Sequence, residues 1–191
     1  MVTDAPDMLQ LPVKLIVAGG FGVGKTTFVG SASDIEPLTT EAAMTTVAEE
    51  IDDVGEVTQK TTTTVAMDFG RLGLEDGLNL FLFGTPGQDR FGFMWDDLCR
   101  GAVGAIVLID SRRFEDCWPA VEYFERTGMP FAAVVNRFDG RLAHGLDEVR
   151  EALDVPAVVP IVDIDARDRS GVLDSIVVLL HHCIARVEAG V

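Results

Sequence analysis

The sequence predicts an α/β fold built around a mostly parallel sheet, and three observations support this prediction. The 191 residues suffice for one ordinary domain with a sizeable core. Apolar residues make up 48% of the chain, which argues against disorder. Short apolar runs alternate with stretches of helical periodicity, as in βαβ units. In such sheets, ligands bind beyond the C-terminal ends of the strands.

Six segments have the composition of strands. Five are short apolar runs of the kind found in strands buried on both faces: residues 13–18, 78–83, 103–109, 131–135 and 158–164. The sixth, residues 62–69, is rich in β-branched residues but more polar, which favours a strand at the sheet edge. The sequence therefore predicts a six-stranded sheet.

Two segments in the second half of the chain have helical spacing of apolar residues. The first contains Leu142, Leu146, Val149 and Leu153. The second forms one apolar stripe near the C-terminus: Val172, Ile176, Leu179, Leu180, Cys183, Ile184 and Val187. Residues 35–60 are instead rich in Thr, Glu and Asp, so we expect a long mobile loop there, with a short helix over residues 41–50 as one option. We expect a single domain over residues 1–191, with its core in 13–188 and a flexible segment at 1–12.

The formal net charge of −16 limits the partners that the surface can attract. Such a surface repels the phosphates of nucleic acids and anionic lipids, so we expect neither as a partner. The sequence shows no secretory signal, its apolar runs are shorter than a membrane span, and it has no C-terminal prenylation cysteine. These features predict a cytoplasmic protein that reaches a membrane only through a partner.

A phosphate-binding loop follows the first predicted strand directly. Residues 19–26 read GGFGVGKT, which matches G-x-x-x-x-G-K-[ST] in full and precedes a predicted helix. The glycines let main-chain N–H groups turn toward phosphates, and the helix N-terminus adds its positive dipole end. Lys25 is expected to reach the β- and γ-phosphates, and Thr26 to offer its hydroxyl to Mg²⁺. Nucleotide contacts are expected from Gly19, Phe21, Gly22, Val23, Gly24, Lys25, Thr26 and Thr27.

Two later segments resemble the guanine-recognition motifs of GTPases. Residues 136–139, NRFD, resemble the N-K-x-D motif, in which the Asp carboxylate accepts two hydrogen bonds from guanine. That role is carried to Asp139, loop bracing to Asn136, and a side chain lying along the base to Arg137. Residues 165–167, DAR, align with the weaker S-A-K signature, which implies that the Ala166 N–H meets the guanine O6 and that Arg167 lies nearby.

Two segments resemble the nucleotide-sensing switches of Ras-like proteins. Residues 64–69, TVAMDF, resemble T-I-G-V-D-F, which implies that Thr64 closes on Mg²⁺ and the γ-phosphate. Residues 83–91, FGTPGQDRF, resemble W-D-T-A-G-Q-E-R-F, so Gly87 would bind the γ-phosphate and Gln88 would orient water. Gly84 replaces the family's Mg²⁺-side Asp, for which Asp68 or a water would compensate. Phe21 replaces a Gly, and its ring would either crowd Gln88 or point outward.

The ordered set of motifs resembles the Ras-like small GTPases and, more narrowly, the bacterial conservon (CvnD-type) GTPases, relatives of the MglA-type GTPases. The resemblance implies a three-layer P-loop NTPase sandwich with one antiparallel edge strand. It also implies a signalling switch for GTP or GDP with Mg²⁺ on Thr26 and Thr64, working beside a roadblock-fold regulator and a sensor-kinase-like complex. Hydrolysis would use Lys25 and Gln88, with Arg90 as the nearest candidate arginine finger, and would be slow without a partner. A regulatory module with negligible hydrolysis and a P-loop ATPase or kinase are the alternatives.

Overall fold

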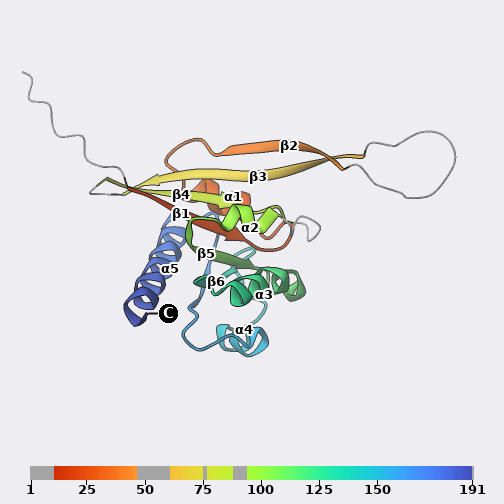
Figure 1. The fold of residues 1–191 in the computed structure, drawn as a ribbon. Coiled ribbons are helices and arrows are strands. Elements are labelled where there is room, and N and C mark those ends of the chain that lie inside the picture. The colour runs from red at the N-terminus through yellow and green to blue at the C-terminus, as the bar shows by residue number, and fades with distance from the viewer. Residues whose placement is uncertain (1–10, 47–60, 75–76, 88–93, 191) are drawn as a thin grey trace, which may run out of the picture.

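The computed structural model describes residues 11–46, 61–74, 77–87 and 94–190 (Figure 1). Within these residues, seven strands form one sheet in the order β2-β3-β4-β1-β5-β6-β7. The parallel part consists of β1 (Leu11–Ala18), β4 (Leu78–Gly84), β5 (Ala102–Ile109), β6 (Phe131–Asn136) and β7 (Ile161–Ile164). The predicted α/β fold with a mostly parallel sheet is therefore confirmed.

The segment predicted as a long loop contains a strand instead. β2 (Leu38–Thr46) pairs with β3 (Thr61–Gly73) in antiparallel register, from Leu38 opposite Phe69 to Thr46 opposite Thr61. The option of a helix over residues 41–50 is wrong for its first six residues, and residues 47–60 lie outside the described part. Threonine has a high strand propensity, and ladder pairing satisfies the main-chain groups of this polar segment.

β2 also changes the place of the antiparallel strand. β3 is antiparallel to β4, as expected for residues 62–69, but it lies between β2 and β4 and is not an edge strand. The sheet thus has seven strands in the described residues where the sequence predicted six. In Figure 1, β2 and β3 form a long ribbon that extends away from the helices.

Helices cover both faces of the sheet and complete a three-layer arrangement (Figure 1). One core cluster joins the sheet to α1 (Lys25–Ala32) and α5 (Arg169–Ala189). A second cluster, on the other face, joins it to α2 (Trp95–Cys99), α3 (Trp118–Thr127) and α4 (Leu146–Leu153). The short 3₁₀ helix η3 (Phe114–Cys117) precedes α3.

The long C-terminal helix is apolar on more than its buried side. The side chain of Asp168 caps α5 by accepting hydrogen bonds from the N–H groups of Ser170 and Gly171. The predicted stripe divides: Val172, Ile176, Leu179 and Cys183 are buried, whereas Ile184 and Val187 are 55% and 79% exposed. By length and composition alone α5 passes as a membrane span, but its buried residues belong to the core on one face of the sheet.

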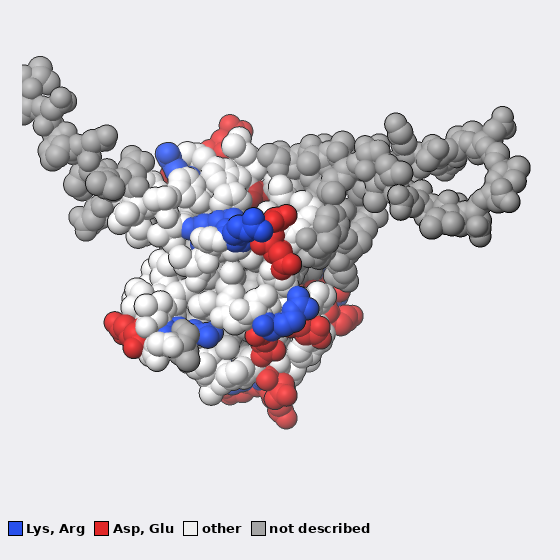
Figure 2. All heavy atoms as spheres, in the orientation of Figure 1, with Lys and Arg blue, Asp and Glu red and all other residues white. Residues whose placement is uncertain are grey.

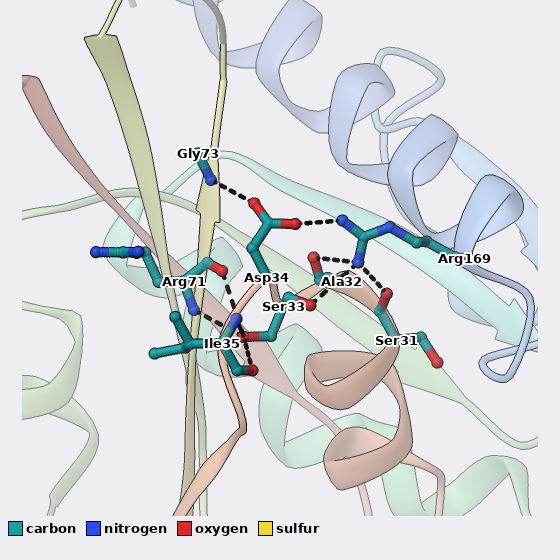
Figure 3. Close-up of polar contacts among 8 residues, drawn as sticks. All are labelled: Ser31, Ala32, Ser33, Asp34, Ile35, Arg71, Gly73 and Arg169. Carbon is teal, nitrogen blue, oxygen red and sulfur yellow. Dashed lines mark hydrogen bonds and ion pairs between the residues drawn. The ribbon is translucent and has the colours of Figure 1, made fainter.

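A polar network fixes the C-terminal end of α1 between α5 and β3 (Figure 3). The Arg169 guanidinium donates to the carbonyl oxygens of Ser31, Ala32 and Ser33 at 2.8–3.1 Å and to Asp34 at 2.5 Å. Asp34 in turn accepts from the N–H of Gly73 on β3 at 2.9 Å. A cation at a helix C-terminus stabilises the unpaired carbonyls there, so this contact positions the helix that begins in the phosphate loop.

Charged side chains are mixed on the face drawn in Figure 2. Lys and Arg groups on this face border Asp and Glu groups, and white surface separates the mixed clusters. Among the described residues drawn on this face, basic and acidic side chains are therefore interspersed.

Candidate nucleotide-binding site

The phosphate loop connects β1 to α1 at the C-terminal edge of the parallel strands. Its path requires glycine, because Gly19, Gly22 and Gly24 have φ values of 137°, 72° and 107°. Space is a second constraint: a Cβ on Gly19 would lie 2.4 Å from the carbonyl oxygen of Leu108. Sequence and structure therefore agree on a tight main-chain loop that leads into a helix N-terminus.

Lys25 is buried at the first position of α1 and folds back along the loop. Its ammonium donates hydrogen bonds to the carbonyl oxygens of Gly19 at 2.8 Å and Gly20 at 2.7 Å. Burial lowers the pKa of Lys25 to about 8, and the nearby Asp68 carboxylate partly opposes that shift. A buried ammonium that is bonded to main-chain carbonyl oxygens is suited to an anionic ligand.

A pocket of about 320 Å³ opens beside the loop and Lys25. Its lining residues are Phe21, Gly22, Gly24, Lys25, Thr26, Thr27, Asp68, Thr85 and Gly87. The Oγ1 of Thr85 is buried and has no hydrogen-bond partner in the described part of the chain. Gly87 lies so close to the loop that a Cβ there would be 2.7 Å from the Lys25 ammonium. The segment after β4 thus forms one wall of the pocket, as expected for Gly87.

A carboxylate from β3 lies beside the predicted metal-binding hydroxyl. Thr26 Oγ1 donates a 2.7 Å hydrogen bond to Asp68 Oδ2, and Asp68 is only 8% exposed. Asp68 is paired directly across the ladder with Gly84. A Cβ on Gly84 would lie 3.1 Å from Asp68 Cβ and 3.2 Å from Asp68 Oδ2. The Asp68 carboxylate therefore lies beside the place that a side chain at position 84 would occupy.

Asn136, at the end of β6, connects the phosphate loop to the loop after β7. Its side-chain amide donates to the carbonyl oxygen of Val23, and its side-chain oxygen accepts from the N–H of Ala166, both at 3.0 Å. The bracing role predicted for Asn136 agrees with this geometry. The Ala166 N–H, which the resemblance assigned to guanine, is engaged with Asn136 here, so a bond to a base would require sharing or exchange.

Of the remaining predicted base-side residues, Asp139 and Arg167 are exposed, whereas Arg137 is half-buried directly after β6. Asp139 has a left-handed backbone with φ of 55°, and with Gly140 it forms the turn between the bridge partners Phe138 and Arg141. Asp-Gly is a favoured pair for such a turn, so Asp139 has a structural role as well. Arg137 forms an ion pair with Asp163 at 2.5 Å, and Arg167 one with Asp165 at 2.7 Å.

Of the four other predicted site residues, two lie in the described part of the chain and two lie outside it. The main chain of Thr64 is paired with Ala43 in the β2–β3 ladder. The side chain of Phe21 is 68% exposed, so of the two orientations considered, the structure has the outward one. Gln88 and Arg90 lie outside the described residues.

Sequence reasoning missed a group of charged residues that directly follows β5. Arg113 donates a hydrogen bond to the carbonyl oxygen of Phe21 in the phosphate loop, and Arg112 lies over the ring of Phe138 beside the Asp139 turn. Both arginines contact Asp110. Two adjacent arginines after a buried strand were the signal, but the sequence does not reveal what they reach.

Two solved structures with a similar fold are parts of FeoB proteins. A G domain of FeoB from Methanococcus jannaschii superposes with a TM-score of 0.60 at 12% identity, covering 91% of this chain and 98% of its own. The cytosolic domain of the FeoB iron transporter from T. maritima has a TM-score of 0.63 at 16% identity, covering 90% of this chain and 64% of its own. At these identities the likeness shows the fold, which is that of a nucleotide-binding G domain.

Sequence comparison gives a family. MJ1339, an uncharacterized protein of Methanocaldococcus jannaschii, is 30% identical over 129 residues, which are 66% of this chain and 71% of that relative. Residues 17–168 match the family described as "conserved hypothetical ATP binding protein". This match begins before the phosphate loop and ends at the residue that caps α5, so it includes the whole candidate site. The chain belongs to this family of conserved hypothetical ATP-binding proteins.

Proposed function

We propose that this chain is a small GTPase that binds GTP or GDP with Mg²⁺ and acts as a nucleotide-dependent signalling switch. One observation carries the proposal: the phosphate loop, the Thr26–Asp68 pair and the β6 loop are joined by direct hydrogen bonds into a single site. A phosphate loop alone occurs in kinases, ATPases and GTPases, so the choice of guanine rests on the segment that begins at Asn136.

The phosphate end of the site has an electropositive environment despite the acidic chain. The main-chain N–H groups of the glycine-rich loop and the N-terminus of α1 supply partial positive charge. Lys25 adds a full charge that is already desolvated, with its pKa lowered to about 8 by burial. A bound diphosphate or triphosphate would raise the pKa of Lys25 again, because a nearby anion favours the ammonium form.

The Thr26–Asp68 pair fits a hydrated Mg²⁺. Hydroxyl, carboxylate, phosphate and water oxygens are the ligands that Mg²⁺ prefers, and the ion usually retains several waters. No group of three or more His, Cys, Asp or Glu side chains in the described residues is arranged to hold a metal ion alone. We therefore assign Thr26 as a direct ligand and Asp68 as the acceptor for a metal-bound water, with Thr64 joining in the triphosphate state. When bound, Mg²⁺ would neutralise phosphate charge.

Guanine selection is assigned to Asp139. Its carboxylate would accept two hydrogen bonds from the N1–H and 2-amino group of guanine, a donor pair that adenine lacks. Asn136 supports this end of the site by holding the loop that contains Ala166. Adenine is the second candidate, and the family description favours it. Displacement of a fluorescent GDP by GTP or ATP separates the two. GTP should compete more strongly for the wild-type chain, and Asp139→Asn should reduce that preference; stronger competition by ATP would refute the assignment.

Hydrolysis is assigned to Gln88, which would orient the attacking water, and to Lys25, with Arg90 as the candidate arginine. Single-turnover phosphate release should fall strongly in Gln88→Ala and Arg90→Ala, and equal rates in both variants and wild type would remove them from the mechanism. A partner arginine is worth about 10³–10⁵ in rate, so the unaided rate should be slow. Nucleotide binding without any phosphate release would identify the chain as a regulatory module.

Switching would follow from loss of the γ-phosphate, which would release the segments around Thr64 and Gly87. The resemblance to conservon GTPases suggests a roadblock-fold regulator and a sensor-kinase-like complex as partners in the cytoplasm. A pull-down with purified candidates, loaded with GDP or a non-hydrolysable GTP analogue, tests this part. Retention that is the same with either nucleotide would contradict a switch.

A further inference from the structure

Asp110 and the two arginines that follow it contact both ends of the candidate site. Asp110 is the first residue after β5 and is 4% exposed. Arg112 donates two side-chain hydrogen bonds to its carboxylate, at 2.9 Å and 2.8 Å, and Arg113 approaches it at 3.6 Å. The hydrogen bonds from Arg112 lower the pKa of the Asp110 carboxyl despite its burial. A buried anion directly after β5 therefore contacts both guanidinium groups.

Arg113 braces the phosphate loop. Its Nη2 donates a 2.9 Å hydrogen bond to the carbonyl oxygen of Phe21, while Nη1 lies 3.5 Å from Asp116. A trans peptide is planar, so its C=O and N–H point in opposite directions. By holding the Phe21 carbonyl, Arg113 directs the N–H of Gly22 away from itself. Gly22 lines the phosphate pocket, where this N–H would be available to a phosphate oxygen.

Arg112 braces the base end instead. Its guanidinium carbon lies 4.0 Å from the centroid of the Phe138 ring, within cation–π distance. Phe138 immediately precedes Asp139 and is a bridge partner of Arg141 across that turn. The bidentate bond to Asp110 fixes the plane of the Arg112 guanidinium, and the stacked ring fixes the start of the turn.

We propose that Arg112 and Arg113 are positioning residues with separate tasks, Arg113 orienting the phosphate loop and Arg112 orienting the base-recognition turn. The inference rests on the proposed nucleotide site and adds a division of labour to it. Neither arginine needs to touch the nucleotide. Each acts through one main-chain segment, and Asp110 keeps the two segments in register with each other.

Inorganic pyrophosphate and GDP distinguish the two tasks, because pyrophosphate has the phosphate groups without the base. Each ligand is used with Mg²⁺ to displace fluorescent GDP from the full chain. Arg113→Gln should weaken the binding of pyrophosphate and the binding of GDP by a similar factor, about tenfold for one lost charge-assisted hydrogen bond. Arg112→Gln should weaken the binding of GDP and leave the affinity for pyrophosphate unchanged. Arg100→Gln is the control, because the Arg100 side chain is 80% exposed and pairs only with Asp97 among the ion pairs of the described residues.

Conservative variants separate positioning from general loss of structure. Arg113→Lys keeps one cationic donor for the Phe21 carbonyl and should recover most of the pyrophosphate affinity. Arg112→Lys cannot form the bidentate, stacked arrangement and should not recover GDP affinity. Thermal unfolding of all variants shows whether they remain folded at the assay temperature.

The outcomes are distinguishable from failure of the proposed function. If the wild-type chain binds neither GDP nor pyrophosphate, the nucleotide site itself is wrong. If the wild type binds both and the Arg112 and Arg113 variants match Arg100→Gln, only the positioning roles are wrong. Equal weakening of pyrophosphate by Arg112→Gln and Arg113→Gln would also overturn the division of labour.

Discussion

Replacing Asp68 by Asn tests whether the charge of the Asp68 carboxylate supports the proposed Mg²⁺ site. Asn has nearly the same shape and keeps an acceptor for the Thr26 hydroxyl, so the change removes charge with little change in packing. The hydrogen bond from Thr26 to Asp68, whose acceptor would lose its charge, is short at 2.7 Å, and Asp68 is only 8% exposed. Hydrogen bonds to charged groups contribute about 1.5–3 kcal/mol, so Mg²⁺-dependent GDP affinity should fall by about tenfold or more.

The ladder offers a sharper variant, because Asp68 and Gly84 are cross-strand partners. Gly84→Asp alone should be harmful, since its Cβ would lie 3.1 Å from Asp68 Cβ and two carboxylates would compete for one place. Exchanging the two residues, as Asp68→Gly with Gly84→Asp, places one carboxylate near the same position from the opposite strand. The exchange should recover much of the affinity that Asp68→Gly loses.

The assay is the dissociation rate of fluorescent GDP over a range of Mg²⁺ concentrations. Wild type should release GDP more slowly as Mg²⁺ rises, and Asp68→Asn should need a higher concentration for the same slowing. Release in excess EDTA should be similar for both proteins, which controls for damage to the phosphate loop. An unchanged Mg²⁺ dependence in Asp68→Asn, or an exchange variant no better than Asp68→Gly, would refute the assignment of Asp68.

Three further predictions concern Lys25, Asn136 and Arg169. The pKa of Lys25 is lowered to about 8 without ligand, and bound phosphates should raise it. The affinity for GDP should therefore not depend on this group below pH 8 and should fall by up to about tenfold per pH unit above pH 8. Equal affinities for GDP at pH 7 and pH 9 would contradict this prediction. Asn136→Ala leaves two buried main-chain groups without their hydrogen bonds and should lower the free energy of unfolding, measured by urea denaturation, by about 2–4 kcal/mol. A smaller loss of stability than in an alanine variant at an exposed site would argue against the bracing role of Asn136. Arg169→Ala removes a half-exposed cation from the carbonyls at the end of α1 and should cost about 1 kcal/mol, whereas Arg126→Ala on α3 should cost less; equal losses in the two variants would count against the capping role.

The strands and the phosphate loop were predictable because their signals are local. A buried parallel strand needs a continuous apolar run, and residues 131–135 form β6 with only Asn136 added at its end. The glycines at positions 19, 22 and 24 are required by the loop path itself. Motif and strand order together were therefore enough to place Lys25, Thr26 and Asn136 in one site.

The parts that sequence reasoning missed depend on pairing between distant segments. Leu38–Thr46 has few core residues and becomes a strand because it pairs with residues 61–69, so its local composition predicted a loop. The carboxylate nearest to Gly84 belongs to Asp68, which is distant in sequence but opposite in the ladder. Arg112 and Arg113 are adjacent, yet they reach different loops, and no sequence spacing reveals that difference.

The binding of GDP and ADP to the full wild-type chain, measured by calorimetry with Mg²⁺ at pH 7, tests the central claim most directly. Two hydrogen bonds from guanine to the Asp139 carboxylate predict that GDP binds at least about a hundredfold more tightly than ADP. Removing Mg²⁺ should weaken GDP binding. Tighter binding of ADP, or no heat of binding with GDP, would contradict the account.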